Sequence, residues 1–291
     1  MYPTLIEIGN FTITTFGVMM FLAFLSAAWA TAPQYERRGI SRELAWDLLA
    51  WVAIGGIVGA KVYYLALHWQ DLAANPLREL TSRGGLVWYG GLIGGVLAYY
   101  WQIRRRNLPV GDMFDSVAPG LMLAYAVGRI GCFLVGDDYG LPTDSWVGIA
   151  FPQGAPPSTA GYLRSVGADI PASIPDATIM SVHPTQLYEV AAGLTLFAFL
   201  WWMSKRGLRS GQLFGLYLGL YGVERFLIEI VRAKGDRLLL GLSTSQMLSV
   251  LLLGLAVFIW QRAGATARPA AAAVARAAGP APNRRANRSS R

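Results

Sequence analysis

Ionisable and aromatic side chains stand four residues apart within one apolar stretch of the sequence: Tyr217, Tyr221, Arg225 and Glu229. This spacing places all four on one face of a helix, so Arg225 can stack on Tyr221 and pair with Glu229. Glu224 points to a different face. An Arg or Lys at the centre of a membrane span costs about 2.5–3.5 kcal/mol on insertion scales, so it normally faces a cavity or a partner. The alternative is an ion pair that only satisfies itself inside a helix bundle.

A second arginine lies between glycines near the end of another apolar stretch, in the run Gly128-Arg129-Ile130-Gly131-Cys132-Phe133. Glycine lets a ligand approach the backbone closely while the guanidinium points at it. Arginine suits a phosphate because its planar fork is always charged and donates two parallel hydrogen bonds. Arg129 and Arg225 together therefore indicate a site for a lipid phosphate. The alternative is that Arg129 only extends toward the lipid headgroups.

Three further residues are weaker candidates. Glu189, which ends the run His183-Pro184-Thr185-Gln186-Leu187-Tyr188-Glu189, either holds a guanidinium in place or belongs to a run that caps and packs a helix. Lys61 either adds a third positive charge or pairs with an acid such as Asp115. Cys132 is the single cysteine and is expected to pack as a small side chain, since no histidine lies near it in sequence to activate a thiol.

Composition sets the environment of these residues. Of 291 residues, 54% are hydrophobic and 14% are charged, whereas a soluble protein carries about 25% charged residues. Seven arginines in residues 262–291 produce most of the net charge of +8, which argues against a DNA-binding core. A spanning helix needs roughly 20 mostly apolar residues, and seven stretches qualify: about 14–33, 44–67, 84–103, 113–135, 186–203, 212–231 and 243–261. The sequence predicts an all-α membrane protein, a bundle of seven transmembrane helices.

Loop charges predict the orientation, because short cytoplasmic loops carry an excess of Lys and Arg. With the N-terminus outside, 16 of these residues lie inside and 6 outside, so the C-terminus is expected in the cytoplasm. Residues 136–182 then face outward as a small extracytoplasmic cap. They separate four helices in residues 1–135 from three in residues 183–261, and residues 262–291 are expected to form a disordered cytoplasmic tail.

Small residues indicate close packing between helices. Glycines at GxxxG spacing occur in three places: Gly55 with Gly59, the run Gly90-Gly91-Leu92-Ile93-Gly94-Gly95, and Gly215 with Gly219. Such glycines let two backbones approach and do not by themselves indicate chemistry.

Four motifs in this order make the chain resemble the prolipoprotein diacylglyceryl transferases of the bacterial inner membrane. The run from Gly128 to Gly140 is similar to the family's G-R-x-G-N-F-x-N-x-E-x-x-G. The others are Gly90-Gly91-Leu92-Ile93-Gly94 for GGLIG, His183 to Glu189 for HPxQLYE, and Arg225 with Glu229 for R-x-x-x-E. The resemblance covers about residues 1–261.

The resemblance implies transfer of the diacylglyceryl group of phosphatidylglycerol to the lipobox cysteine of a preprolipoprotein signal peptide, on the outer-leaflet side of the inner membrane. Membrane lipids are further partners, and no cofactor, metal or nucleic acid is implied. The implied catalytic residues are Arg129, Arg225, Tyr89, Tyr221 and Glu229. The implied substrate-binding residues are Arg129, Gly128, Gly131, Asp137, Gly140, Lys61 and Glu189.

The chain departs from the family pattern at polar positions. Cys132 and Val135 stand where the family has Asn, Asp137 where it has Glu, Tyr89 where it has His, and Phe16 where it has Tyr. The acceptor of the thiol proton is therefore open between Tyr89, Asp137 and water. We expect a positive pocket to favour the thiolate, with Tyr89 as a positioning group.

Two other functions remain open at this point. A phospholipid-binding transporter or scaffold of the same fold would keep the arginines without catalysing transfer, and the substituted positions favour it. An ion channel would need a continuous polar path, and the inner halves of the predicted spans hold few polar residues.

Overall fold

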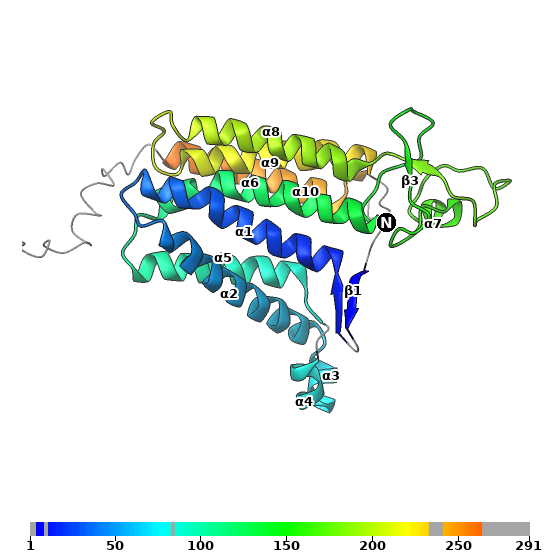
Figure 1. Ribbon diagram of the computed structural model, residues 1–291, viewed down its shortest axis with the longest axis horizontal. Coiled ribbons are helices and arrows are strands. Elements are labelled where there is room, and N and C mark those ends of the chain that lie inside the picture. The colour runs from blue at the N-terminus through cyan, green and yellow to red at the C-terminus, as the bar shows by residue number, and fades with distance from the viewer. Residues whose placement is uncertain (1–3, 9–10, 83–84, 233–240, 264–291) are drawn as a thin grey trace, which may run out of the picture. The chain divides into compact units, whose positions relative to one another are not determined.

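A computed structural model describes residues 4–8, 11–82, 85–232 and 241–263, mostly as helices (Figure 1). The chain divides into two compact units. In the described part of the chain, the first comprises residues from 4 to 31 and from 114 to 263, and the second comprises residues from 32 to 113. From residue 264 onward, the expected cytoplasmic tail lies outside the described residues.

All seven stretches expected to span a membrane are helical. They correspond to α1 (Thr15–Glu36), α2 (Glu43–Leu67), α5 (Trp88–Arg105), α6 (Val110–Val135), α8 (Thr185–Met203), α9 (Gln212–Val231) and α10 (Thr244–Arg262). Among the described helices, α1, α2, α6 and α10 are long and apolar enough to cross a membrane. The chain is therefore a mostly helical protein with four candidate membrane spans.

Several short elements lie outside these helices. Strands β1 (Thr4–Ile8) and β2 (Phe11–Thr14) form an antiparallel hairpin before α1. Two six-residue helices, α3 (Trp69–Ala74) and α4 (Pro76–Thr81), follow α2. Proline at the first position of α4 suits a helix start, where its missing N–H is not needed. None of these elements was expected from the sequence.

In the second unit, helices α2 and α5 pack backbone to backbone. A Cβ atom added at Gly94 would lie 2.2 Å from the carbonyl oxygen of Gly55, and one added at Gly59 would lie 2.4 Å from that of Gly90. No side chain fits in so narrow a space, so the predicted close approach at these glycines is confirmed. At the far end of α5, the Tyr99 hydroxyl lies 2.9 Å from that of Tyr35.

Replacing Gly94 by alanine is expected to lower stability by about 1–3 kcal/mol, because the added methyl group forces α2 and α5 apart. The measurement is the midpoint of thermal unfolding in detergent. Gly254→Ala in α10 is the matched control: its added Cβ meets no described atom within 4 Å, and alanine is the better helix former. An unchanged midpoint for Gly94→Ala would contradict the close contact.

In the first unit, α6, α8, α9 and α10 run side by side (Figure 1). Asp115 of α6 fixes the start of α9, since its carboxylate accepts hydrogen bonds from the backbone N–H groups of Gly211 (2.8 Å) and Phe214 (2.7 Å). This is a helix cap, which satisfies donors that have no partner within the helix.

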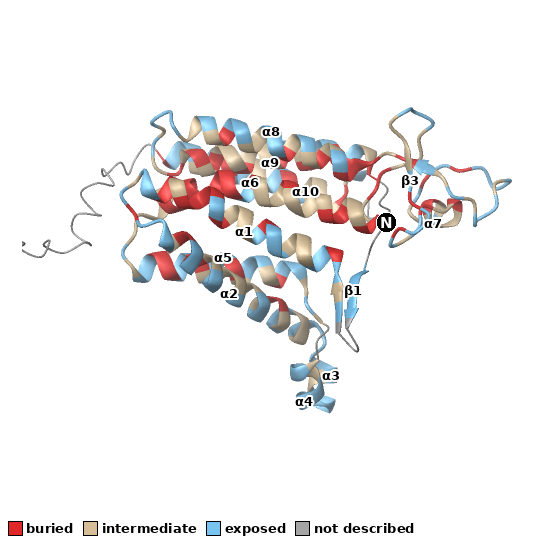
Figure 2. Ribbon diagram, in the orientation of Figure 1, coloured by how far each residue is buried: buried red, intermediate tan, exposed pale blue. Residues whose placement is uncertain are grey.

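Residues 136–182 contain a hydrophobic core of their own. Strands β3 (Ile149–Ala150) and β4 (Ser181–Val182) pair antiparallel, and α7 (Ala160–Ser165) packs beside them. The buried core includes Tyr139, Phe151, Leu163 and Val182, and Figure 2 shows buried segments within this part of the chain. The Arg164 guanidinium donates hydrogen bonds to backbone carbonyl oxygens in this segment, including that of Pro171 at 3.1 Å.

Candidate active site

The charged residues of the first unit meet where three helices begin or end. The last turns of α6 carry Arg129, and the first turns of α8 carry Glu189. The last turns of α9 carry Arg225 and Glu229, and Arg232 follows directly. The segment after α6 adds the acidic pair Asp137-Asp138, whose backbone carbonyls accept hydrogen bonds from the side chains at the start of α8: Thr185 and Gln186.

Glu189 lies between the two arginines singled out from the sequence. Its side chain is fully buried, and one carboxylate oxygen, Oε1, serves three donors. It lies 3.1 Å from Nη2 of Arg129 and 2.5 Å from Nη1 of Arg225, and it accepts a hydrogen bond from the Tyr125 hydroxyl at 2.8 Å. Arg129 also lies over the Tyr125 ring, 5.3 Å from its centre. One buried anion thus fixes both guanidinium groups.

Two further acids, Glu229 and Asp138, connect the same two arginines to a third arginine, Arg232. Oε2 of Glu229 lies 3.3 Å from Nη2 of Arg225 and 3.8 Å from Nη1 of Arg232. Asp138 pairs with Nη2 of Arg232 through one oxygen and with Nη1 of Arg129, at 3.0 Å, through the other. Positive and negative groups therefore alternate in a closed circuit, which we call the charge ring: Arg129, Glu189, Arg225, Glu229, Arg232 and Asp138.

The charge ring is electrically balanced, with three arginines and three carboxylates. Each charge has two opposite neighbours, which offsets the cost of removing it from water. The Asp138 side chain is 35% exposed, whereas the other five are at most 14% exposed. Its backbone has a φ of 58°, in the left-handed region that Asp tolerates better than most residues. Asp138 is therefore the accessible member of the ring.

Sequence reasoning missed four residues here: Tyr125, Asp138, Glu224 and Arg232. Glu224 does not point away from the site, because its carboxylate oxygens lie 3.0 and 3.1 Å from the Tyr125 hydroxyl. Arg232 is one of the six basic residues counted outside from the loop charges of the sequence, yet its side chain is 3% exposed. Its position three residues after Glu229 continues the same helix face, and that spacing was the available signal.

The predicted aromatic and glycine positions have different surroundings from those expected. Tyr221 packs edge to face on Tyr125, with ring centres 5.3 Å apart, and Tyr125 is the ring over which Arg129 lies. A Cβ at Gly131 would lie 2.8 Å from that of Met19, so glycine at this position lets α1 pack closely and leaves no room there for a ligand. A Cβ at Gly128 would meet no described atom within 4 Å.

Gly140 lies at a crossing of backbones. A Cβ there would lie 2.5 Å from the Val231 carbonyl oxygen and 2.9 Å from the His183 Cβ. Its own N–H donates to the His183 carbonyl at 2.8 Å, and Gly140 also bridges to Arg232. Glycine at this position thus brings the segment after α6 against the ends of α8 and α9.

Two predicted site residues belong to the second unit. Lys61 donates from Nζ to the Ser82 hydroxyl at 2.8 Å and to its carbonyl at 3.1 Å. Tyr89 packs edge to face on Trp88 and is 45% exposed. Their proposed roles rest on the sequence resemblance.

Asp137 and Cys132 lie beside the charge ring. The Cys132 thiol is buried, and its sulfur lies 3.8 Å from Nη1 of Arg129. Burial and the neighbouring Asp138 raise the pKa of Asp137 to about 6. Cys132, Asp137 and Asp138 offer ligand atoms within 4.8 Å of one another. Because Asp138 is already shared by Arg129 and Arg232, the arrangement suits hydrogen bonding better than a metal ion.

Comparison with known proteins identifies the family of the chain. The family model for prolipoprotein diacylglyceryl transferase matches residues 3–262. Proteins named phosphatidylglycerol–prolipoprotein diacylglyceryl transferase are similar along most of the chain. One from Clostridium tetani is 32% identical over 262 residues, covering 89% of this chain and 97% of the relative. One from Chromohalobacter salexigens is 32% identical over 269 residues, covering 89% and 92%. The chain therefore belongs to the prolipoprotein diacylglyceryl transferase family.

Proposed function

We propose that this protein transfers the diacylglyceryl group of phosphatidylglycerol to the lipobox cysteine of a preprolipoprotein. The observation that carries the proposal is the charge ring, in which three motifs that are distant in sequence meet around Arg129 and Arg225, whose side chains are 14% and 10% exposed. The names of the relatives support the same reaction. A bundle whose motifs only packed helices would not need to bury Arg129 and Arg225 at one carboxylate.

The proposed setting is the bacterial inner membrane, with seven spans and the N-terminus outside. The four candidate spans and three further helices at the expected positions support this arrangement. In this orientation the charge ring lies near the outer leaflet, and residues 136–182 form the extracytoplasmic cap. Lipid then reaches the ring from the leaflet in which lipobox cysteines emerge.

Each arginine of the balanced charge ring already has two acidic partners. A lipid phosphate can therefore bind these arginines only by replacing one of the acids. Asp138 is the accessible acid and pairs with Arg129. We infer that the phosphate displaces Asp138 from Arg129 and Arg232 and binds these guanidinium groups bidentately, while Arg225, fixed beside Arg129 by Glu189, adds positive charge to the site. The same groups stabilise the charge that develops on the leaving phosphate.

The proposed step forms one bond and breaks another. The thiol sulfur attacks the glyceryl carbon, the bond from that carbon to the phosphate oxygen breaks, and glycerol phosphate leaves with the electron pair. The thiol proton passes to an acceptor, for which Asp137 is the best-placed group in the first unit. An oxygen of its carboxyl lies within 4.8 Å of an oxygen of Asp138, the ring member that we expect the phosphate to displace.

The Asp137 assignment predicts the pH dependence of transfer. The carboxylate is present above its pKa of about 6 and is lost as the pH falls through that value. Transfer is therefore expected to decline below about pH 6, and Asp137→Asn is expected to remove this limb and lower the plateau. The measurement is the pH profile of kcat/KM in proteoliposomes. A limb that persists in Asp137→Asn would assign the proton to another group.

Tyr89→Phe separates positioning from proton transfer. If Tyr89 orients substrate, loss of the hydroxyl is expected to reduce the rate about threefold to tenfold, the magnitude of one net hydrogen bond. A general base contributes about 10²–10⁴-fold. Rates measured for wild type and Tyr89→Phe distinguish the two, and a loss beyond a hundredfold would contradict the positioning role.

The proposed function is tested with purified full-length protein in vesicles of phosphatidylglycerol. A lipobox peptide is expected to gain one diacylglyceryl group by mass spectrometry, and the same peptide with Ser in place of Cys is expected to remain unmodified. Complementation of a strain depleted of its own transferase should restore lipoprotein lipidation. Binding of phosphatidylglycerol without modification in either assay would favour a lipid-binding scaffold.

A further inference from the structure

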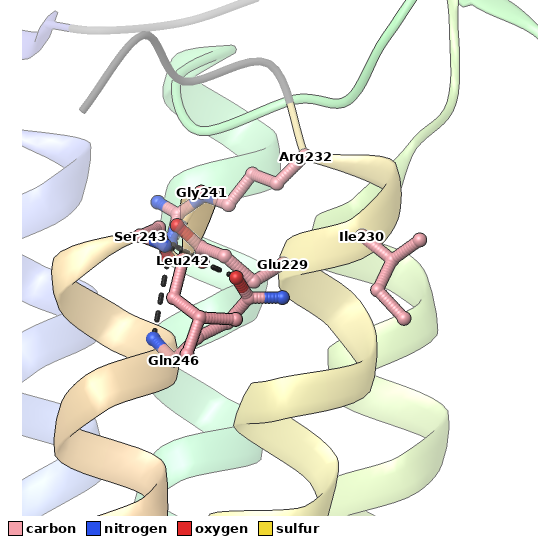
Figure 3. A pocket seen from close by; sticks show the side chains of 7 residues that line it. All are labelled: Glu229, Ile230, Arg232, Gly241, Leu242, Ser243 and Gln246. Atoms are coloured by element: carbon pink, nitrogen blue, oxygen red, sulfur yellow. Dashed lines mark hydrogen bonds and ion pairs between the residues drawn. The ribbon is translucent and has the colours of Figure 1, made fainter. Parts of the chain in front are cut away.

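The end of α9 and the start of α10 line a partly open cavity of about 230 Å³ beside the charge ring. Glu229, Arg232, Ser243 and Gln246 are among the residues that line it (Figure 3). Ser243 and Gln246 cap α10 reciprocally, each backbone N–H donating to the side chain of the other at 3.1 and 3.2 Å. The first turn of α10 is thereby fixed as one wall, and the end of α9 supplies the other.

At the end of α9, two buried polar atoms lack a hydrogen-bond partner within the described part of the chain: Nε of Arg232 and Oε1 of Glu229. The two side chains are only 3% and 2% exposed. Nε is a donor and Oε1 is an acceptor. A buried polar group without a partner is costly, so its partner is expected to be a group that enters the cavity.

The pair of atoms selects the chemistry of that group. A hydroxyl accepts a hydrogen bond and donates another, so a single hydroxyl can satisfy Nε and Oε1 together. An ammonium only donates hydrogen bonds and would be repelled by the Arg232 guanidinium. A phosphate or carboxylate without a proton only accepts them and would be repelled by the Glu229 carboxylate. Since a water molecule occupies roughly 30 Å³ in the liquid, a cavity of about 230 Å³ has room for a small polyol.

We propose that this cavity binds the glycerol hydroxyls of the phosphatidylglycerol headgroup, an inference that rests on the proposed function. Glu229 connects the cavity to the arginines of the charge ring: its Oε2 lies 3.3 Å from Arg225, while its Oε1 is free of described partners. The headgroup glycerol is esterified to the phosphate that these arginines bind. The same hydroxyls then leave on the glycerol phosphate product.

The test compares two lipid donors that share acyl chains: phosphatidylglycerol, and phosphatidylpropanol, which lacks the headgroup hydroxyls. Wild-type protein in proteoliposomes is expected to prefer phosphatidylglycerol roughly tenfold or more in kcat/KM, the contribution of a hydrogen bond to a charged group. Arg232→Lys keeps a positive charge facing Asp138 but has no Nε, so it is expected to lose most of this preference. Asp138→Asn disturbs the same ion pair without altering the cavity wall, so it is expected to retain the preference.

Because the preference is a ratio within one protein, partial loss of active protein does not affect it. Equal use of the two donors by wild type would mean that the cavity holds water only, and would overturn the inference even if no variant folded. A preference as large in Arg232→Lys as in wild type would overturn it as well. Transfer from neither donor would instead overturn the proposed function, and the inference with it.

Discussion

Replacing Glu189 by glutamine is expected to abolish most of the transfer activity and to destabilise the first unit. The amide has the same shape but no charge, so the guanidinium groups of Arg129 and Arg225 would be left facing each other across it. Removing one partner of a buried ion pair costs about 3–5 kcal/mol. We expect a lower thermal midpoint in detergent and a loss of roughly 10²–10³-fold in kcat/KM.

Two matched controls make this result specific. Glu36→Gln changes an exposed pair, with Arg42 at 3.4 Å, and is expected to cost less than about 1 kcal/mol. Glu224→Gln alters the other carboxylate beside the Tyr125 hydroxyl. That hydroxyl has one proton to donate to Glu189 or Glu224, so an amide that donates back to Tyr125 is expected to be tolerated. Equal losses in Glu189→Gln and Glu224→Gln would contradict the central place of Glu189.

Arg129→Ala is expected to reduce transfer by about 10²–10³-fold, because it removes the guanidinium that we propose binds the phosphate and stabilises its developing charge. Arg129→Lys is expected to recover only part of this loss, since an ammonium is a point charge and cannot bind bidentately. The measurement is kcat/KM for phosphatidylglycerol with a fixed lipobox peptide. Arg105→Ala removes an exposed arginine of α5 and is expected to leave transfer unchanged. Near-wild-type transfer by Arg129→Ala would exclude a phosphate role for this residue.

The helices were predictable because a span in lipid must satisfy its own backbone hydrogen bonds. A long apolar stretch therefore has few alternatives, and the expected 212–231 coincides with α9. The hairpin of β1 and β2 and the short helices α3 and α4 were missed because segments of four to six residues are too short for a periodic pattern. The core of residues 136–182 depends on contacts between residues distant in sequence, which periodicity does not report.

The candidate site was predictable where one helix carries the signal. Arg225 and Glu229 are four residues apart on α9 and form the expected pair. Contacts between helices were not predictable in this way. Glu224 reaches the site through Tyr125 on a different helix, and Glu189 meets both arginines through one oxygen. Spacing along one element places residues on a face, but it does not identify what lies opposite.

The closed charge ring has a consequence for biosynthesis. Its members are synthesised in a fixed order, and Arg129 enters the membrane before Glu189, Arg225 or Glu229 exists. Asp138 is its one ring partner nearby in sequence, so this pair can accompany α6 during insertion. Glu189 then arrives with α8, and the last three members arrive together at the end of α9. The acid that we expect lipid to displace in the mature protein is thus the one that first neutralises Arg129 in the nascent chain.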